Sequence, residues 1–282
     1  MTTFPELARR RRAVGLAKAV LVHGQVIAGR FRGGGPKPGL RVLIYHRVSD
    51  DCDQFAVSPE AFKRQMEALA ESGQRVVDLY EIETLNLAPD EAAVALTFDD
   101  GYRDILENAL PVLREHGFPS TVFVVPGAMD GECAFSWYPP GGMPALAGWD
   151  ELRAEERAGL VRFEPHTLTH PILTTVSNDA AEREIVGSKD AIERELGRPA
   201  KIFCYPAGYH SQREVEIVRA CGMRAAVTCE FGANHAPFTS FELRRTMIEC
   251  FDPLWVFRAR LTGATDAAPP GRRSRRVETL AA

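Results

Sequence analysis

The sequence lacks the cysteine pattern of a disulfide-bonded scaffold. Six cysteines are spread over 282 residues, and none forms a C-x-x-C pair. Several lie in apolar stretches, such as Cys204 after Ile202 and Phe203, where cysteine behaves as a small hydrophobic residue. This usage favours a reducing compartment, and we expect a cytoplasmic protein.

An excess of positive charge is also lacking. The chain has 34 Lys and Arg against 38 Asp and Glu, a formal net charge of -4. Nucleic-acid binding needs clustered basic residues that neutralise phosphates. Basic runs occur only at 9–12 and 272–276, without interleaved aromatic residues, so we interpret both as solvated tails. We therefore expect no nucleic-acid partner.

No apolar run is long enough to cross a bilayer. Residues 13–22 follow the basic run 9–12 and loosely imitate an export signal, but Lys18 interrupts them and no clean cleavage site follows. We interpret the segment as an amphipathic leader helix. The alternative is a weak export or membrane-association signal, which leaves a peripheral membrane contact open.

The Gly- and Pro-rich segment 33–39 is the clearest boundary in the chain. We expect a leader helix and linker over 1–39, one folded domain over 40–263 and a disordered tail over 264–282, where Pro, Arg and Ala dominate. With 45% hydrophobic residues, a chain of this length can bury one large core.

Strand and helix signals alternate along this domain. Ser58 followed by Pro59 marks a helix start, and Gly117, Gly197 and Gly222 mark helix ends. Apolar strands separated by amphipathic helices predict a parallel sheet covered on both faces, and six or more such units favour an α/β barrel. Strands are expected over 41–45, 75–79, 93–98, 120–125, 201–205, 224–228 and 241–247, and helices from 59 onward and over 104–116, 178–196, 212–221 and 253–261.

Two carboxylates, Asp99 and Asp100, come directly after the apolar strand 93–98. In parallel α/β folds, ligands and catalytic residues gather at the carboxyl ends of the strands. Asp-Asp-Gly is by itself an ordinary turn. However, adjacent carboxylates at a buried strand end repel each other, and a cation beside them relieves that cost.

His166 and His170 form the second half of the pattern. Pro165 and Pro171 bracket them, so we expect a single turn at a strand end, with both rings on one side. Two imidazoles and one carboxylate leave coordination positions open, as in catalytic zinc sites. The remaining carboxylate can then take a proton from water, which favours hydrolysis, although the same ligands also occur in non-haem iron oxygenases.

The motifs 97–101 (TFDDG) and 166–171 (HTLTHP) resemble the first two motifs of the polysaccharide deacetylase family, which includes nodulation-type chitooligosaccharide deacetylases. The stretches 43–48 and 203–208 agree, and the resemblance covers about 42–263, so the folded domain is expected to be the catalytic domain. It implies a distorted (β/α) barrel that removes acetyl groups from amino sugars with one divalent metal ion. Zn is the leading candidate for that ion, with Co, Ni and Fe(II) as alternatives.

The resemblance also implies a role for each motif residue. Asp99 becomes the general base, and Tyr205, Pro206 and Gly208 match the third motif, which lines the substrate groove and helps to hold the oxyanion. The expected metal ligands are Asp100, His166 and His170.

Two residues of the family pattern are missing. The third motif usually carries an arginine that orients the base, and the strand 201–205 has none, so Arg245 is our candidate substitute. The usual acid is a late histidine, yet no histidine follows His235, so His46 is our candidate for the general acid.

The expected partner is a glycan or a lipid-linked oligosaccharide. Trp137 and Tyr138 are candidates either for stacking on sugar rings or for anchoring their loop, and His210 is expected in the groove or at the surface. The alternative functions are hydrolysis of a small cyclic amide or ureide, and sugar binding by a catalytically decayed site.

Overall fold

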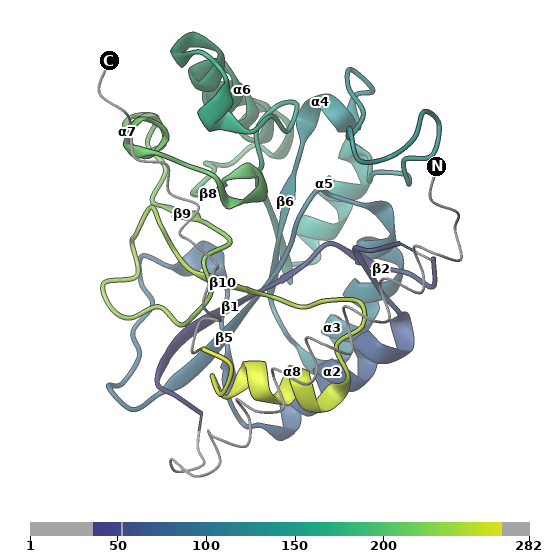
Figure 1. Ribbon diagram of the computed structural model, residues 1–282, viewed down its shortest axis with the longest axis vertical. Coiled ribbons are helices and arrows are strands. Elements are labelled where there is room, and N and C mark those ends of the chain that lie inside the picture. Colours follow the sequence, from purple (N-terminus) through teal and green to yellow (C-terminus); the bar gives the residue numbers. More distant parts are fainter. Residues whose placement is uncertain (1–35, 52, 267–282) are drawn as a thin grey trace.

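Parallel strands form the centre of the fold in this computed structural model, which describes residues 36–51 and 53–266 (Figure 1). Five strands pair in the order β10-β1-β5-β6-β7, and the short strand β4 also pairs with β5. Every pairing between these strands is parallel. The strands are β1 (Gly39–Tyr45), β4 (Arg75–Val76), β5 (Ala92–Phe98), β6 (Ser120–Val124), β7 (Val161–Pro165) and β10 (Arg245–Met247).

A second parallel pair, β8 (Ile202–Cys204) and β9 (Ala225–Val227), closes the ring. On one side, Val227 forms a parallel bridge with Leu243, two residues before β10. On the other side, β7 and β8 are neighbours without a paired ladder. The sheet is therefore a distorted barrel with one irregular seam, and the predicted fold class is confirmed.

Glu164 holds this seam together. Its buried carboxylate accepts hydrogen bonds of 2.7 Å from the backbone N–H groups of both Lys201 and Ile202, and one of 2.6 Å from Arg198. Arg198 also donates to the carbonyl of Phe163 on β7, at 2.7 Å. These side-chain bonds satisfy strand groups that a regular ladder would otherwise pair.

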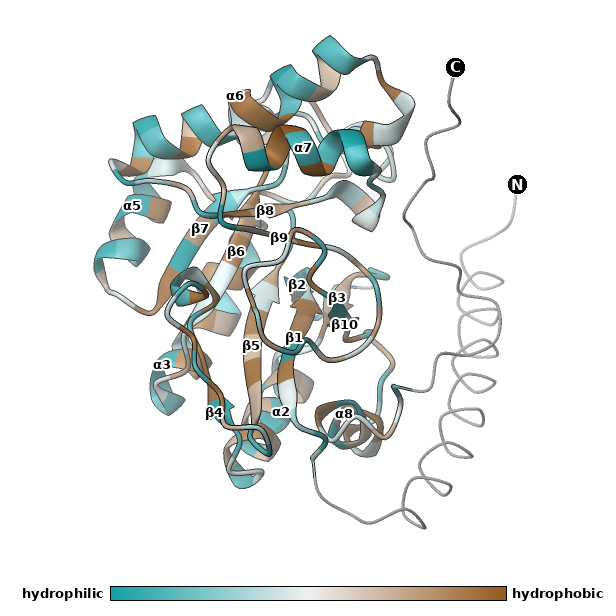
Figure 2. Ribbon diagram, turned by 90° about the vertical axis from the view of Figure 1, so that its left-hand side faces the viewer, coloured by the Kyte–Doolittle hydropathy of each residue, from teal (hydrophilic) through white to brown (hydrophobic). Residues whose placement is uncertain are grey.

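Helices surround the strands (Figures 1 and 2). The expected start at Ser58 and the expected ends at Gly117 and Gly197 are confirmed: Ser58 accepts from a backbone N–H group, and the two glycines adopt φ of 66° and 68°. The α-helices are α2 (Pro59–Glu71), α3 (Leu110–His116), α4 (Pro126–Met129), α5 (Trp149–Arg157), α6 (Asn178–Leu196), α7 (Gln212–Ala220) and α8 (Leu254–Leu261). Shorter elements are β2 (Arg47–Val48), β3 (Ala56–Val57), the π-helix η2 (Ile105–Ala109) and the 3-10 helices η1 (Leu79–Glu81), η3 (Leu173–Thr175) and η4 (Pro206–Gly208).

Some elements differ from the expectation. The strands expected over 75–79 and 241–247 are confined to β4 and β10, because the chain turns into η1 after the first and approaches β10 as an irregular segment bonded to β9. Neither α5 nor β7 was predicted. Arg162 and Glu164 break the apolar run of β7, and they are tolerated there because each has an ionic partner.

The two faces of each strand pack into different parts of the core. Val42 of β1 and Ala95 of β5 belong to the apolar cluster inside the barrel, together with Phe123, whereas Leu43 and Phe98 pack in the cluster that includes the helices. Figure 2 shows the hydrophobic residues concentrated in the strands. Since side chains alternate along a strand, Asp99 has the same parity as Ala95 and faces the barrel interior.

Residues 1–35 of the expected leader and linker (1–39) lie outside the described residues. The same holds for residues 267–282 of the expected tail (264–282). Within the described ranges, we find no helix with the length and apolar character that crossing a membrane requires.

Candidate functional site

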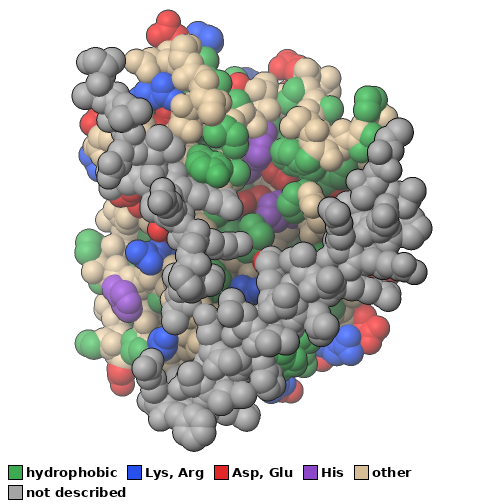
Figure 3. All heavy atoms as spheres, viewed as in Figure 1, with side chains coloured by type: hydrophobic (Ala, Val, Ile, Leu, Met, Phe, Trp, Pro, Cys, Tyr) green, Lys and Arg blue, Asp and Glu red, His purple; other side chains and the backbone are tan. Residues whose placement is uncertain are grey.

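The predicted residues meet at the carboxyl ends of the barrel strands. Asp99 and Asp100 follow β5, His166 follows β7 and His46 follows β1. The backbone bonds from Asp99 N to Tyr45 O and from His166 N to Val124 O, both 2.9 Å, extend the strand ladders into the site. On this face of the molecule, histidine and acidic side chains lie in a hollow bordered by hydrophobic side chains (Figure 3).

Asp100, His166 and His170 form a group that suits a metal ion. The Oδ1 atom of Asp100 lies 3.7 Å from Nε2 of His166 and 3.6 Å from Nε2 of His170. Asp100 and His166 are each only 2% exposed, and Asp100 Oδ1 has no hydrogen-bond partner in the described part of the chain. A buried carboxylate oxygen without a donor is costly, and a divalent cation held by these three atoms would satisfy it.

The titration of these groups agrees with a ligand role. Burial lowers the pKa of His166 to about 4 and that of His170 to about 3, so both rings are neutral at physiological pH and have a free lone pair. Burial and then the neighbouring Asp99 raise the pKa of Asp100 well above its ordinary value. This repulsion between adjacent carboxylates is the cost that a bound cation relieves.

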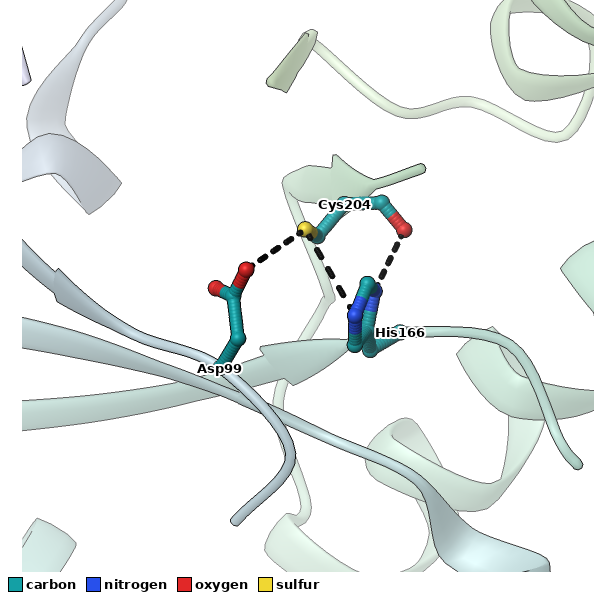
Figure 4. Close-up of side chains that lie close together, drawn as sticks. All are labelled: Asp99, His166 and Cys204. Carbon is teal, nitrogen blue, oxygen red and sulfur yellow. Dashed lines mark hydrogen bonds between the residues drawn. The ribbon is translucent and has the colours of Figure 1, made fainter. Parts of the chain in front are cut away.

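A backbone hydrogen bond fixes the orientation of His166. Its Nδ1 lies 2.8 Å from the carbonyl oxygen of Cys204, as Figure 4 shows. A carbonyl oxygen can only accept, so Nδ1 must carry the proton and Nε2 is left as the ligand atom. Such support of a ligating histidine by a second hydrogen bond is typical of metal sites.

Three residues at the site have a left-handed backbone. The φ angles are 75° at Asp100, 63° at Thr167 and 61° at His170. Thr167 is β-branched, and this conformation costs such a residue roughly 1 to 3 kcal/mol, a strain that persists only where the surroundings impose it. The loop 166–170 is therefore held in its conformation by its contacts.

Glu184 of α6 supplies two of those contacts. Its carboxylate accepts from Thr169 N at 2.9 Å and from Thr169 Oγ1 at 2.6 Å. Thr167 Oγ1 also accepts from His170 N at 3.0 Å, and the carbonyl of Leu168 accepts from Gly127 N at 2.9 Å. A side chain at Gly127 would place Cβ only 2.7 Å from that carbonyl, so this close approach requires glycine.

Asp99 is paired with an arginine and not with a histidine. Arg245 donates to both of its oxygens, at 2.7 Å and 2.9 Å, and the pair is buried. Burial alone would raise the pKa of Asp99, but the charge and hydrogen bonds of Arg245 bring it down to about 2. Arg245 is itself held by the carbonyl of Thr228 at 2.8 Å and by Thr97 Oγ1 at 3.2 Å. The structure thus places Arg245 directly on the predicted base.

Cys204, which was predicted only as a small hydrophobic residue, lies between these groups. Its Sγ is 3.8 Å from Asp99 Oδ2 and 3.9 Å from His166 Nε2 (Figure 4). It also lies 3.0 Å from Arg245 Nη2. Asp99, His166 and Cys204 are also residues of metal-ligating type within reach of one another. The guanidinium of Arg245 already supplies the positive charge there, so the group around Asp100 is the better metal site.

His46 is half-buried, and its ring lies 4.9 Å from that of Phe55. Burial lowers its pKa, and the charge of Asp99 opposes this effect. His46 is thus close enough to Asp99 to interact with it electrostatically.

Tyr205 was predicted to line the substrate groove, but its side chain lies in the interior. Its side chain is fully buried and stacks on the ring of His210 at 4.8 Å. His210 is buried too, in contrast to the groove or surface position expected for it, and its ring nitrogens contact Gly208 O at 3.0 Å and Glu242 at 3.1 Å. Pro206 and Gly208 lie in η4, and at Gly208 a Cβ would come within 2.5 Å of Cys229 N. The backbone N–H groups of Tyr205, Gly208 and Tyr209 donate to Val227 O, Tyr205 O and Pro206 O, so these donors are used within the fold.

Comparison with known proteins agrees with the motifs. A family model described as polysaccharide deacetylase matches residues 86–226, half of the chain, and this range contains both carboxylates and both metal-site histidines. The chain is 24% identical over 219 residues to the poly-beta-1,6-N-acetyl-D-glucosamine N-deacetylase of Staphylococcus aureus, a match that covers 73% of this chain and 72% of that protein.

Solved structures with a similar fold include the deacetylase PplD of Streptococcus pyogenes in complex with acetate. It has a TM-score of 0.68 and 22% identity, with 80% of this chain and 99% of that chain covered. IcaB from Ammonifex degensii gives a TM-score of 0.65 at 22% identity, with 82% and 98% covered. At these identities the likeness establishes the barrel fold.

Proposed function

The chain belongs to the polysaccharide deacetylase family, and on that premise we propose that it is a metal-dependent hydrolase of N-acetyl groups on the amino sugars of a polysaccharide. The observation that carries this proposal is that two adjacent carboxylates, Asp99 and Asp100, have different surroundings. Asp100 faces two neutral histidines and has an unsatisfied oxygen, whereas Asp99 is held ionised by Arg245. With this ligand set, metal-assisted hydrolysis can use one carboxylate to bind the ion and the other as the general base.

Asp100, His166 and His170 would hold the divalent ion, and when bound it polarises the acetyl carbonyl and acidifies a water molecule. Asp99 then takes the proton of the attacking water. Because Arg245 binds both oxygens of Asp99, the carboxylate is ionised and fixed in place before the substrate arrives.

As water adds to the carbonyl carbon, the C–N bond of the amide breaks and acetate is released, and the amine of the sugar needs a proton to leave. We assign that proton to His46, which is close enough to Asp99 for their charges to interact and which would receive the proton that Asp99 takes from water.

Replacement of His46 tests its role as the acid. His46→Asn should lower kcat for acetate release by roughly 10²- to 10⁴-fold, the usual contribution of a general acid, while the metal content stays unchanged. A variant that retains full activity would remove His46 from the mechanism.

The substrate is proposed to be a polymer of N-acetylglucosamine, as the name of the Staphylococcus aureus relative specifies for that protein. Acetate release should be measured on β-1,4-linked chitooligosaccharides, on β-1,6-linked N-acetylglucosamine oligomers and on a cyclic amide, each with and without chelator. Release from a glycan that chelator abolishes and added Zn²⁺ restores supports the proposal. Turnover of the cyclic amide alone, or glycan binding without turnover, would contradict it.

A further inference from the structure

Two loops from different parts of the chain bring aromatic rings to the active-site histidines. Phe55 lies in the loop between β2 and β3, and Trp137 lies in the loop between α4 and α5. The ring of Phe55 is 4.9 Å from His46, and the ring of Trp137 is 5.0 Å from His170. Phe55 and Trp137 are 6.1 Å apart, edge to face. They thus form one continuous surface, which we call the aromatic wall, beside the predicted acid and one metal ligand.

The aromatic wall is held in place from behind. The ring of Phe135, which is 3% exposed, stacks on Trp137 at 4.6 Å and an interplanar angle of 8°. Asp53 joins the two loops, because its Oδ2 accepts from Tyr138 Oη at 2.7 Å and from Arg47 at 2.8 Å. Tyr138 therefore anchors its loop, and of the two aromatic residues singled out in the sequence only Trp137 faces the histidines.

Phe55 and Trp137 are half-buried, in contrast to Phe135 behind them. Part of each ring is thus exposed to solvent, next to His46 for Phe55 and next to His170 for Trp137. A pyranose ring has an apolar face of C–H groups and polar groups at its edge. Partly exposed aromatic rings next to a few precisely oriented polar groups are what binding such a molecule requires.

We propose that Phe55 and Trp137 bind the pyranose ring whose N-acetyl group is placed at the metal site, and so determine specificity for sugar substrates. The inference rests on the proposed function, since it assumes that the bound molecule is an N-acetylated sugar. The contacts with His46 and His170 place the sugar ring between the acid and the metal ligands, with its acetamido group directed toward Asp99.

The test is a direct binding measurement that needs no turnover. The Kd of an N-acetylglucosamine pentamer should be measured calorimetrically on the Zn²⁺-loaded Asp99→Asn protein and on further variants in that background. Phe55→Leu and Trp137→Leu should each raise Kd about tenfold, the effect of losing a ring contact worth about 1.4 kcal/mol. Trp137→Phe should recover most of the affinity.

Phe118→Leu is the matched control, because Phe118 is also a half-buried ring but precedes β6 at the opposite end of the barrel. Its Kd should equal that of the parent. Unchanged affinity in both Phe55→Leu and Trp137→Leu would overturn the proposal, and the two variants lie in separate loops, so misfolding of one leaves the other as a test.

Acetate release by the protein with Asp99 intact separates this proposal from the proposed function. If acetate is released but both leucine variants bind normally, the aromatic wall is wrong and the function stands. If the pentamer binds in a wall-dependent manner but no acetate is released, the aromatic wall stands and the proposed deacetylation is wrong.

Discussion

Neighbouring aspartates have different surroundings at this site, and two local features explain the difference. Asp99 continues the alternation of β5 and therefore points into the barrel, where it meets Arg245. Asp100 leaves the strand with φ of 75°, which turns its carboxylate toward His166 and His170. One change of backbone conformation thus separates the base from the metal ligand.

Arg245→Lys tests the pairing at the scale of single residues. Lysine keeps the charge but cannot bind both oxygens of Asp99 as the guanidinium fork does. We expect kcat for acetate release to fall by roughly 10- to 100-fold with unchanged Zn²⁺ content. The acidic limb of the pH–rate profile should also move to higher pH, because weaker pairing lets the pKa of Asp99 rise from about 2 toward its buried, unpaired value. An unchanged profile would show that Arg245 does not control the ionisation of Asp99.

The sequence could identify most of these residues but not all of their neighbours. Recognisable motifs contain Asp99, Asp100, His166 and His170. Because the segment 201–205 has no arginine, Arg245 was predicted to replace it. Cys204 lies 105 and 38 residues along the chain from Asp99 and His166, and Glu184 lies 15 residues from Thr169, so the sequence alone does not indicate these contacts. Their roles depend on how β8 and α6 pack, which only the folded structure shows.

At the scale of elements, the loop 166–170 is the critical part of the site. It follows β7. This strand was not predicted, because Arg162 and Glu164 interrupt its apolar residues. The long helix α6, which was predicted over 178–196 with its end at Gly197, places Glu184 against Thr169. The predictable helix thus stabilises the strained loop.

Replacing Glu184 tests this support. Glu184→Gln keeps the size of the side chain but cannot accept both hydrogen bonds of Thr169 with a charged group. We expect the Kd for Zn²⁺ to rise by roughly 10- to 100-fold, the usual effect of removing a group that orients a metal ligand. Glu182→Gln, on an exposed position of the same helix, is the control and should bind Zn²⁺ normally. Equal affinities in the two variants would mean that the loop does not depend on Glu184.

For the whole molecule, the barrel is closed by side chains where its backbone pairing fails. The parallel strands and the fold class were predictable from the alternation of apolar strands and helices. The seam between β7 and β8 was not, because it depends on the tertiary contacts of Glu164 with Arg198 and two backbone N–H groups. Glu164 is two residues from His166, so the closure of the barrel also positions one metal ligand.

The buried histidines couple the stability of the metal-free protein to pH. The pKa values of His166 and His170 in the folded chain are about 4 and 3, against about 6.5 when unfolded, so the unfolded chain binds more protons as the pH falls below 6.5. Each histidine therefore lowers the free energy of unfolding by up to about 1.4 kcal/mol per pH unit through this range.

Asp100 and Glu164 have raised pKa values and act in the opposite direction, so the difference between two proteins is the informative quantity. Urea denaturation of the chelated protein at pH 7, 6 and 5 should show a smaller loss of stability for His170→Gln than for the parent. Parallel pH dependences would mean that His170 is not held neutral by the fold.

The central claim is that Asp100 binds the metal while Asp99 takes the proton, and one paired measurement tests it most directly. Zn²⁺ content and acetate release should be determined side by side for Asp99→Asn and Asp100→Asn. We predict that Asp99→Asn retains the metal and loses activity by roughly 10²-fold or more, whereas Asp100→Asn loses both. Retention of metal by Asp100→Asn together with its loss in Asp99→Asn would contradict the account.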